Sequence, residues 1–163
     1  MNGLRSRLET AFEIVVMMLM AALAIVVILG VGFRKFGAPL VWYDEVASIL
    51  LAWLTYYGAA LAALKGTHIG FPKLVASSPL GVQKILLVVR EVVVVGFFAL
   101  IAWAGWQVVV ILEGSTLVSL PWVPASIAQS VIPIGAVLFI VAELVAFVER
   151  WSRLADMAQG VGK

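Results

Sequence analysis

The sequence predicts an all-α integral membrane protein with four transmembrane helices. Hydrophobic residues account for 64% of the 163 residues, whereas charged residues account for only 12%. A soluble domain carries about twice that charged fraction, and the mean hydropathy of +1.14 agrees with a membrane protein. The apolar residues form four long runs between short polar segments, and each run is long enough to cross a bilayer as a helix. We expect one domain, residues 1–163, made of two helical hairpins.

The first two expected spans cover residues 14–33 and 46–64. The first is too long for the apolar region of a signal peptide and lacks a small-residue cleavage site, so we interpret it as a mature helix. The second is an uncharged run of about 28 Å at ~1.5 Å per residue, which matches the hydrocarbon core of a bilayer. Asp44 and Glu45 stand immediately before it, and Lys65 follows it.

The other two expected spans cover residues 85–112 and 124–148. The third span carries Arg90 and Glu91 in its first turns and is apolar from there on. The fourth span carries Pro133 near its outer end and Glu143 toward its inner end.

The distribution of lysine and arginine predicts that both termini are cytoplasmic. Of the eleven basic residues, only Arg34 and Lys35 lie in a loop that would then be outside. The positive-inside rule therefore gives four helices with an N-in/C-in topology. Trp42, Tyr43 and Trp122 then lie at the outer interface, which amphipathic rings prefer.

Both ends of the chain have an amphipathic pattern that predicts short interfacial helices. Apolar residues recur at three- or four-residue spacing among charged residues before the first span and after the fourth. They are Leu4, Leu8 and Phe12 at one end, and Trp151, Leu154 and Met157 at the other.

The composition also excludes several functions. The chain has no cysteine and one histidine, which excludes disulfides, thiolate metal sites and a haem held by two histidines. No nucleophile–base pair, metal cluster or cofactor motif is visible in the sequence. We therefore expect no cofactor, no enzymatic activity and no nucleic-acid partner.

The second span has a stripe of small and polar residues along one face. Small side chains let helix backbones approach closely in lipid, where packing replaces the hydrophobic drive between helices. The stripe could pack within this subunit or dock a second membrane protein, and both interpretations remain open. Its members are Glu45, Ser48, Ala52, Thr55, Ala59 and Ala63.

The charged residues near the spans suggest ion pairs. Asp44 and Glu45 suit the positive end of a helix dipole, and Arg34 and Lys35 are their expected partners across the short outer loop. Glu143 lies deep enough for its ionised form to cost a few kcal/mol if unpaired. It would either pair with Arg90 or reach the interface, or it would serve in proton coupling.

Several short motifs resemble those of the small membrane subunit of TRAP transporters, the tripartite ATP-independent periplasmic systems. The resemblance covers residues 14–150. Its motifs are Trp42-Tyr43-Asp44-Glu45, Gly58-Ala59 and Gly66-Thr67-His68-Ile69 in and after the second span, and Pro121, Ser126 and Ile132-Pro133-Ile134-Gly135 toward the fourth.

The resemblance implies a bacterial or archaeal inner-membrane protein with a scaffolding role. In such systems a periplasmic binding protein captures an organic acid, often a dicarboxylate or sialic acid. A large multi-helix subunit then carries the acid inward, driven by a sodium gradient. The small subunit would clasp the large one through Trp42, Glu45 and the stripe, with His68 at the cytoplasmic end of the contact.

The residues themselves agree with a scaffold. The spans show no Gly/Pro-interrupted pair of half-helices, no acidic cluster for sodium and no deep arginine for a carboxylate. Arg34, Lys35 and Trp122 lie on the outer loops, where they could also contact the binding protein. The alternative is a self-sufficient, proton-coupled homo-oligomeric transporter that uses Glu143 as its coupling carboxylate.

Overall fold

The computed structural model describes residues 2–66 and 79–160, and these residues are almost entirely helical. The helices are α1 (Asn2–Lys35), α2 (Tyr43–Lys65), α4 (Leu80–Ile111), the short α5 (Ala125–Gln129) and α6 (Val131–Gly160). Within the described residues, four helical segments are long and apolar enough to cross a membrane. They are α1, α2, α4, and α5 joined to α6. The expected four-helix membrane fold is confirmed, whereas the orientation of the termini stays a prediction.

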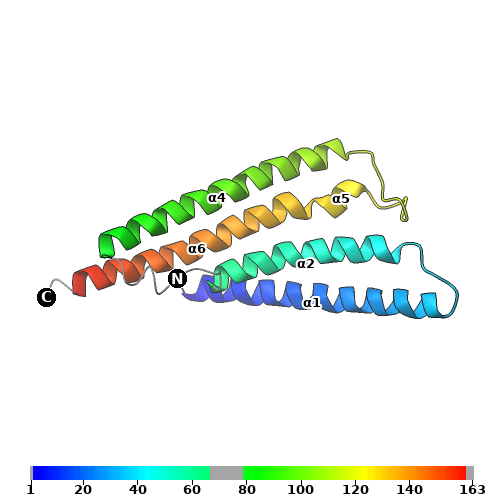
Figure 1. Ribbon diagram of the computed structural model, residues 1–163, viewed down its shortest axis with the longest axis horizontal. Coiled ribbons are helices and arrows are strands. Elements are labelled where there is room, and N and C mark those ends of the chain that lie inside the picture. Colours follow the sequence, from blue (N-terminus) through cyan, green and yellow to red (C-terminus); the bar gives the residue numbers. More distant parts are fainter. Residues whose placement is uncertain (1, 67–78, 161–163) are drawn as a thin grey trace.

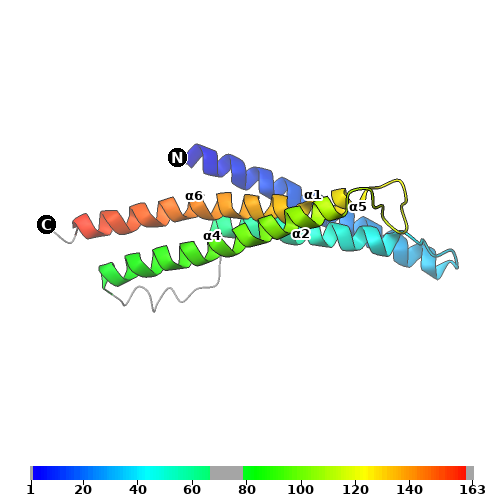
Figure 2. The same ribbon diagram turned by 90° about the horizontal axis from the view of Figure 1, so that it is seen from above.

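The membrane helices form a single layer in the order α1, α2, α6, α4 (Figure 1). The main contacts join α1 to α2, α2 to α6, and α6 to α4. Seen from above, α1 and α4 tilt in opposite directions, so the layer is twisted (Figure 2). Both termini lie at one end of the layer, here called the termini end. The connections 36–42 and 112–124 lie at the opposite end, here called the loop end.

The core of the layer lies in its termini half, where α1, α2 and α6 meet. Its buried members are Phe12, Ala60, Ala63, Leu64, Phe139 and Ala142. Alanine at these positions lets α2 and α6 approach closely, as small residues do between helices in lipid. Leu8 also packs against this cluster. The amphipathic start of the chain is therefore continuous with α1 and contributes to the core.

Two glycines of the loop half fix the spacing of α6 against its neighbours. A Cβ added at Gly135 would lie 2.6 Å from the Cβ of Tyr56 on α2. One added at Gly105 of α4 would lie 2.6 Å from the Cγ2 of Ile132 on α6. Both contacts are closer than real side chains allow, so glycine is required where the backbones approach.

The helix boundaries differ from the expected spans mainly at the polar ends. The third helix begins at Leu80, before the expected residue 85, and the fourth is broken at Ser130 into α5 and α6. Pro133 then stands in the first turn of α6, where a residue without a backbone N–H leaves no helical hydrogen bond unmade. A helix can continue beyond the bilayer into a segment with polar side chains. This explains why α1, α4 and α6 extend beyond the expected apolar spans.

Candidate partner interface

Glu45 holds the connection between α4 and α5 against the start of α2. Its carboxylate accepts hydrogen bonds from the backbone N–H of Val118 at 3.1 Å and of Ser119 at 2.8 Å, and also from the Ser119 hydroxyl. Trp53, two turns along α2, donates its indole N–H to the carbonyl oxygen of Ala128 in α5 at 3.1 Å. The loop end of the second hairpin is thus fastened to α2 by hydrogen bonds at two residues, Glu45 and Trp53.

Arg34 connects the end of α1 to the start of α2. Its guanidinium lies 4.0 Å from the carboxylate of Asp44, hydrogen-bonds the Tyr43 hydroxyl, and sits 5.3 Å from the centre of the Tyr43 ring. The expected pairing across the short outer loop is confirmed for Arg34 and Asp44. Lys35 is exposed and makes no ion pair within the described part of the chain. The expected ion pair of Glu45 is wrong for the described residues, because its carboxylate accepts hydrogen bonds from two backbone N–H groups and the Ser119 hydroxyl instead.

The small-residue stripe of α2 is exposed toward the loop end and buried toward the termini end. Toward the loop end, Ser48 and Thr55 are exposed, and their hydroxyls donate to the carbonyl oxygens one turn back, each at 2.8 Å. Ala52 and Ala59 are half-buried, and Ala63 is fully buried in the core. The termini half of the stripe therefore packs within the subunit, whereas its loop half is free to meet a partner.

The remaining candidate residues lie at the loop end or outside the described residues. Trp42 precedes α2 and is half-buried, while Trp122 projects from the connection 112–124 with 77% of its surface exposed. His68 falls in the segment 67–78, outside the described residues. Phe36, Val41 and Val118 are also largely exposed, so the loop end carries apolar as well as basic groups.

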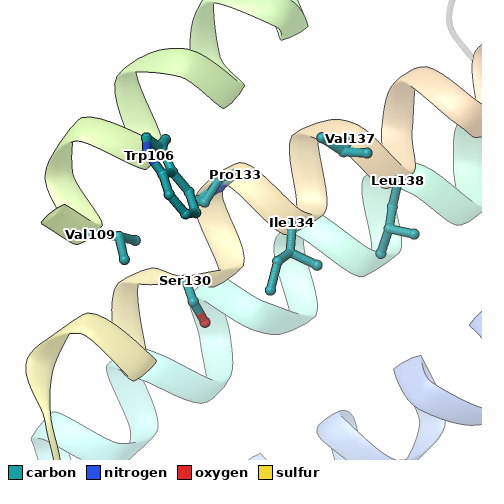
Figure 3. A pocket seen from close by; sticks show the side chains of 7 residues that line it. All are labelled: Trp106, Val109, Ser130, Pro133, Ile134, Val137 and Leu138. Carbon is teal, nitrogen blue, oxygen red and sulfur yellow. The ribbon is translucent and has the colours of Figure 1, made fainter.

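An apolar groove opens between α4 and α6 where the fourth helix is broken (Figure 3). It has a volume of about 380 Å³, and the ring of Trp106 faces Pro133 across it. The Ser130 hydroxyl at its edge already donates to the carbonyl of Ile127 at 2.7 Å. The groove therefore offers apolar contact alone. Its lining residues are Trp106, Val109, Ser130, Pro133, Ile134, Val137 and Leu138.

Ion pairs join all three helices of the core at the termini end. Arg5 of α1 pairs with Glu149 of α6 and also donates to the carbonyl of Leu64, near the end of α2, at 3.0 Å. Lys65 lies 2.6 Å from the carboxylate of Glu13 and 3.8 Å from that of Glu9, both on α1.

Glu143 is fully buried and receives two arginines at one oxygen. Its Oε1 lies 2.7 Å from Arg90 of α4 and 3.1 Å from Arg150, two turns along α6. The expected pairing with Arg90 is confirmed. The ion pair between Arg90 and Glu143 is therefore a structural link between α4 and α6, and Arg150 adds a second contact from within α6.

Sequence reasoning missed three features of these sites. The loop amides that bind Glu45 carry no sequence signal, because every residue except proline has a backbone N–H. The pairing of Arg5 with Glu149 joins the two ends of the chain, and only the layer order brings them together. The third is the burial of Glu91, whose exposed fraction is only 6%, although it sits beside a charged residue at the start of a span.

The described residues contain no group of three or more histidine, cysteine, aspartate or glutamate side chains that could hold a metal ion. A comparison with protein families matches residues 23–153 to the family described as tripartite ATP-independent periplasmic transporters, DctQ component. A search of curated proteins finds no match for this chain.

Proposed function

Because the chain belongs to the DctQ component family of tripartite ATP-independent periplasmic transporters, we propose that it scaffolds the large transport subunit and carries no substrate site itself. The observation that supports this role most directly is the single layer of helices (Figure 1). Helices arranged in a row enclose no path for a polar solute, and they leave two broad faces open. Such a shape suits a subunit that lies along a larger one.

The area of the layer is large enough for a stable contact. The chain exposes 10566 Å², whereas a compact protein of 17.5 kDa exposes about 7,900 Å² by the usual size scaling. The excess of about 2,700 Å² on this one chain compares with about 1,000–2,500 Å² per partner in obligate interfaces, which bury ~2,000–5,000 Å² in total. Lipid covers whatever part of it a partner does not.

We propose that the partner docks on the loop half of the α2 stripe, at Ser48, Ala52 and Thr55. These residues are small, and two of them are exposed in a helix that has neighbours on both sides of the layer. Ala59 and Ala63 then act from inside, by keeping α2 close to its own neighbours. Trp42 and Glu45 shape the end of the same face by fixing the start of α2 and the loop above it.

The docking face can be tested by adding bulk to it. Thr55→Trp should abolish co-purification of the large subunit, because a bulky ring prevents two backbones from approaching. Ile25→Trp is the matched control, because Ile25 is 58% exposed on the edge helix α1 and should tolerate a large apolar side chain in lipid. Equal co-purification of both variants with the large subunit would contradict this placement of the interface.

We further propose that the loop end contacts the periplasmic binding protein through Arg34, Lys35 and Trp122. The exposed indole provides an apolar contact, and Lys35, which makes no ion pair with the described residues, provides a cationic one at the same end of the layer. Reversing the charge of Lys35 with Glu should slow uptake at low salt, and the difference should fade at high salt as charges are screened. Unchanged low-salt uptake in a double Arg34→Glu, Lys35→Glu variant would contradict the contact.

The family suggests the rest of the activity. We propose uptake of an organic acid, such as a dicarboxylate or sialic acid, driven by a sodium gradient through the large subunit in the bacterial or archaeal inner membrane. The positive-inside pattern supports an orientation in which both termini are cytoplasmic.

The alternative function, a self-sufficient transporter coupled through Glu143, has less support. Both arginines bind one oxygen of the buried Glu143, and the pair with Arg90 joins α6 to α4, so the contacts of this residue favour a structural role. Solute uptake by the chain alone in liposomes, abolished by Glu143→Gln, would favour the alternative over the scaffold.

A further inference from the structure

We propose that Glu91 and Glu143 form a carboxyl–carboxylate pair that holds one proton at the seam between α4 and α6, with Glu91 as its protonated member. The site lies at the termini end of the seam and takes a proton as its ligand. It is independent of the docking function, because it rests on contacts within this chain.

The first observation is the burial of an acid that has no partner. Glu91 is 6% exposed, and neither of its carboxylate oxygens accepts a hydrogen bond within the described part of the chain. An ionised carboxylate that is buried and unpaired costs roughly several kcal/mol of free energy, even near the edge of a bilayer. A proton removes that cost and gives Glu91 a hydroxyl that can donate a hydrogen bond.

The second observation is that an acid of the next helix lies at nearly the same height as Glu91. Phe98 of α4 and Phe139 of α6 stack across the seam with their ring centres 3.7 Å apart. Glu91 lies two turns from Phe98 on the same face, and Glu143 lies one turn from Phe139 on the same face. At ~1.5 Å per residue the two acids are offset by only about 4–5 Å along the seam. The Oε2 atom of Glu143 is buried and accepts no hydrogen bond either.

The third observation is that the nearby arginines bind Glu143 and not Glu91. Arg90 and Arg150 both bind Oε1 of Glu143, and neither binds Glu91. By the register of the two helices, Glu143 is the acid of α6 at about the height of Glu91, and its negative charge disfavours a second carboxylate beside it. The adjacent Arg90 opposes protonation of Glu91, but its side chain is about one-third exposed and its guanidinium is engaged by Glu143.

The other charged groups at this end have partners of their own. On α6, Glu149 pairs with Arg5, and on α4 the ammonium of Lys84 lies 5.9 Å from the ring centre of Trp151. The short helix α5, which also packs on α4, contains no charged residue. Glu143 is therefore the carboxylate with which Glu91 would share a proton.

The pair can be detected in the full chain reconstituted in lipid nanodiscs. Infrared spectra recorded across a pH series should show a protonated carboxyl band at neutral pH in the native sequence. Glu91→Gln, which keeps the shape and removes the acid, should delete that band. Glu143→Gln is the matched variant, and it should weaken the Glu91 band at neutral pH because the neighbouring negative charge is gone and Arg90 becomes available.

Unfolding supplies a second readout. A glutamate in an unfolded chain is ionised at neutral pH, so folding would take up one proton and stability should fall as the pH rises. Glu91→Gln should remove this slope and unfold no earlier than the native chain at neutral pH. Glu143→Gln should unfold earlier throughout, because two partly buried arginines lose their partner.

Two results would overturn the proposal. One is a native spectrum at neutral pH in which no protonated carboxyl band is lost on Glu91→Gln. The other is a Glu91→Gln variant that fails to fold, or that loses as much stability as Glu143→Gln. Either outcome would mean that the folded chain needs Glu91 in its ionised form, hydrated or paired with a positive charge.

Discussion

Single residues at the two ends of the layer determine how the helices are held. The charged pairs Arg34–Asp44 and Arg90–Glu143 could be predicted from the sequence, because each joins opposite charges expected at the same depth of the bilayer. The role of Glu45 could not be predicted, because its partners are mainly the amides of a loop whose path depends on the whole layer.

Glu45→Arg should release the connection 112–124 from α2. Arginine cannot accept hydrogen bonds, so the amides of Val118 and Ser119 lose their acceptor at a cost of about 1–3 kcal/mol. Hydrogen exchange at these two amides should rise by about tenfold or more. Assembly with the large subunit and uptake should be lost together, because the end of the docking face would then be disordered.

Asp44→Arg is the control for that substitution. Asp44 precedes Glu45 on the same helix but is exposed, and its ion pair with Arg34 measures 4.0 Å. An exposed pair of this kind contributes roughly 0–1 kcal/mol, so exchange at Val118 and Ser119 should stay unchanged. If Glu45→Arg assembles normally yet abolishes transport, Glu45 acts in transport directly and the scaffold interpretation of this residue is wrong.

At the scale of elements, the number and type of the helices follow from the sequence, but their neighbours do not. In lipid an outward face is as apolar as a packed one, so α1 and α4 give no periodic signal that marks a contact. The close approaches of α6 to α2 and α4 depend on single glycines, and a sequence contains other glycines that touch nothing. The structure distinguishes these two kinds of glycine.

Gly135→Ala should weaken the contact between α6 and α2. The new methyl group would overlap the side chain of Tyr56, and relieving such an overlap typically costs about 1–3 kcal/mol. Gly96→Ala on α4 is the matched control, because a Cβ there meets no other atom within 4 Å. It should leave stability unchanged or raise it by up to ~1 kcal/mol. Unfolding in lipid bicelles by titration with a denaturing detergent measures both, and equal midpoints would contradict the packing of Gly135.

At the scale of the whole molecule, the absence of cysteine makes the topology directly measurable. We expect Ser6→Cys and Ser152→Cys, both exposed at the termini end, to react with an impermeant thiol reagent only from the cytoplasmic side. Ser115→Cys at the loop end should react only from the periplasmic side. The native chain, which has no thiol, is the background control, and the reverse pattern of labelling would contradict the N-in/C-in orientation.

The order of helices in the layer also determines how the molecule comes apart. Since α1 touches mainly α2, and α4 mainly α6, the structure resembles a short one-dimensional array of nearest-neighbour interfaces. Such arrays lose cooperativity when one interface is weaker than the next, and a single melting temperature then ceases to describe them. The edge helices should detach before the α2–α6 pair separates. A subunit without its partner would accordingly lose its edge helices first. A large subunit bound along the layer would hold all four helices together and make the unfolding all-or-none.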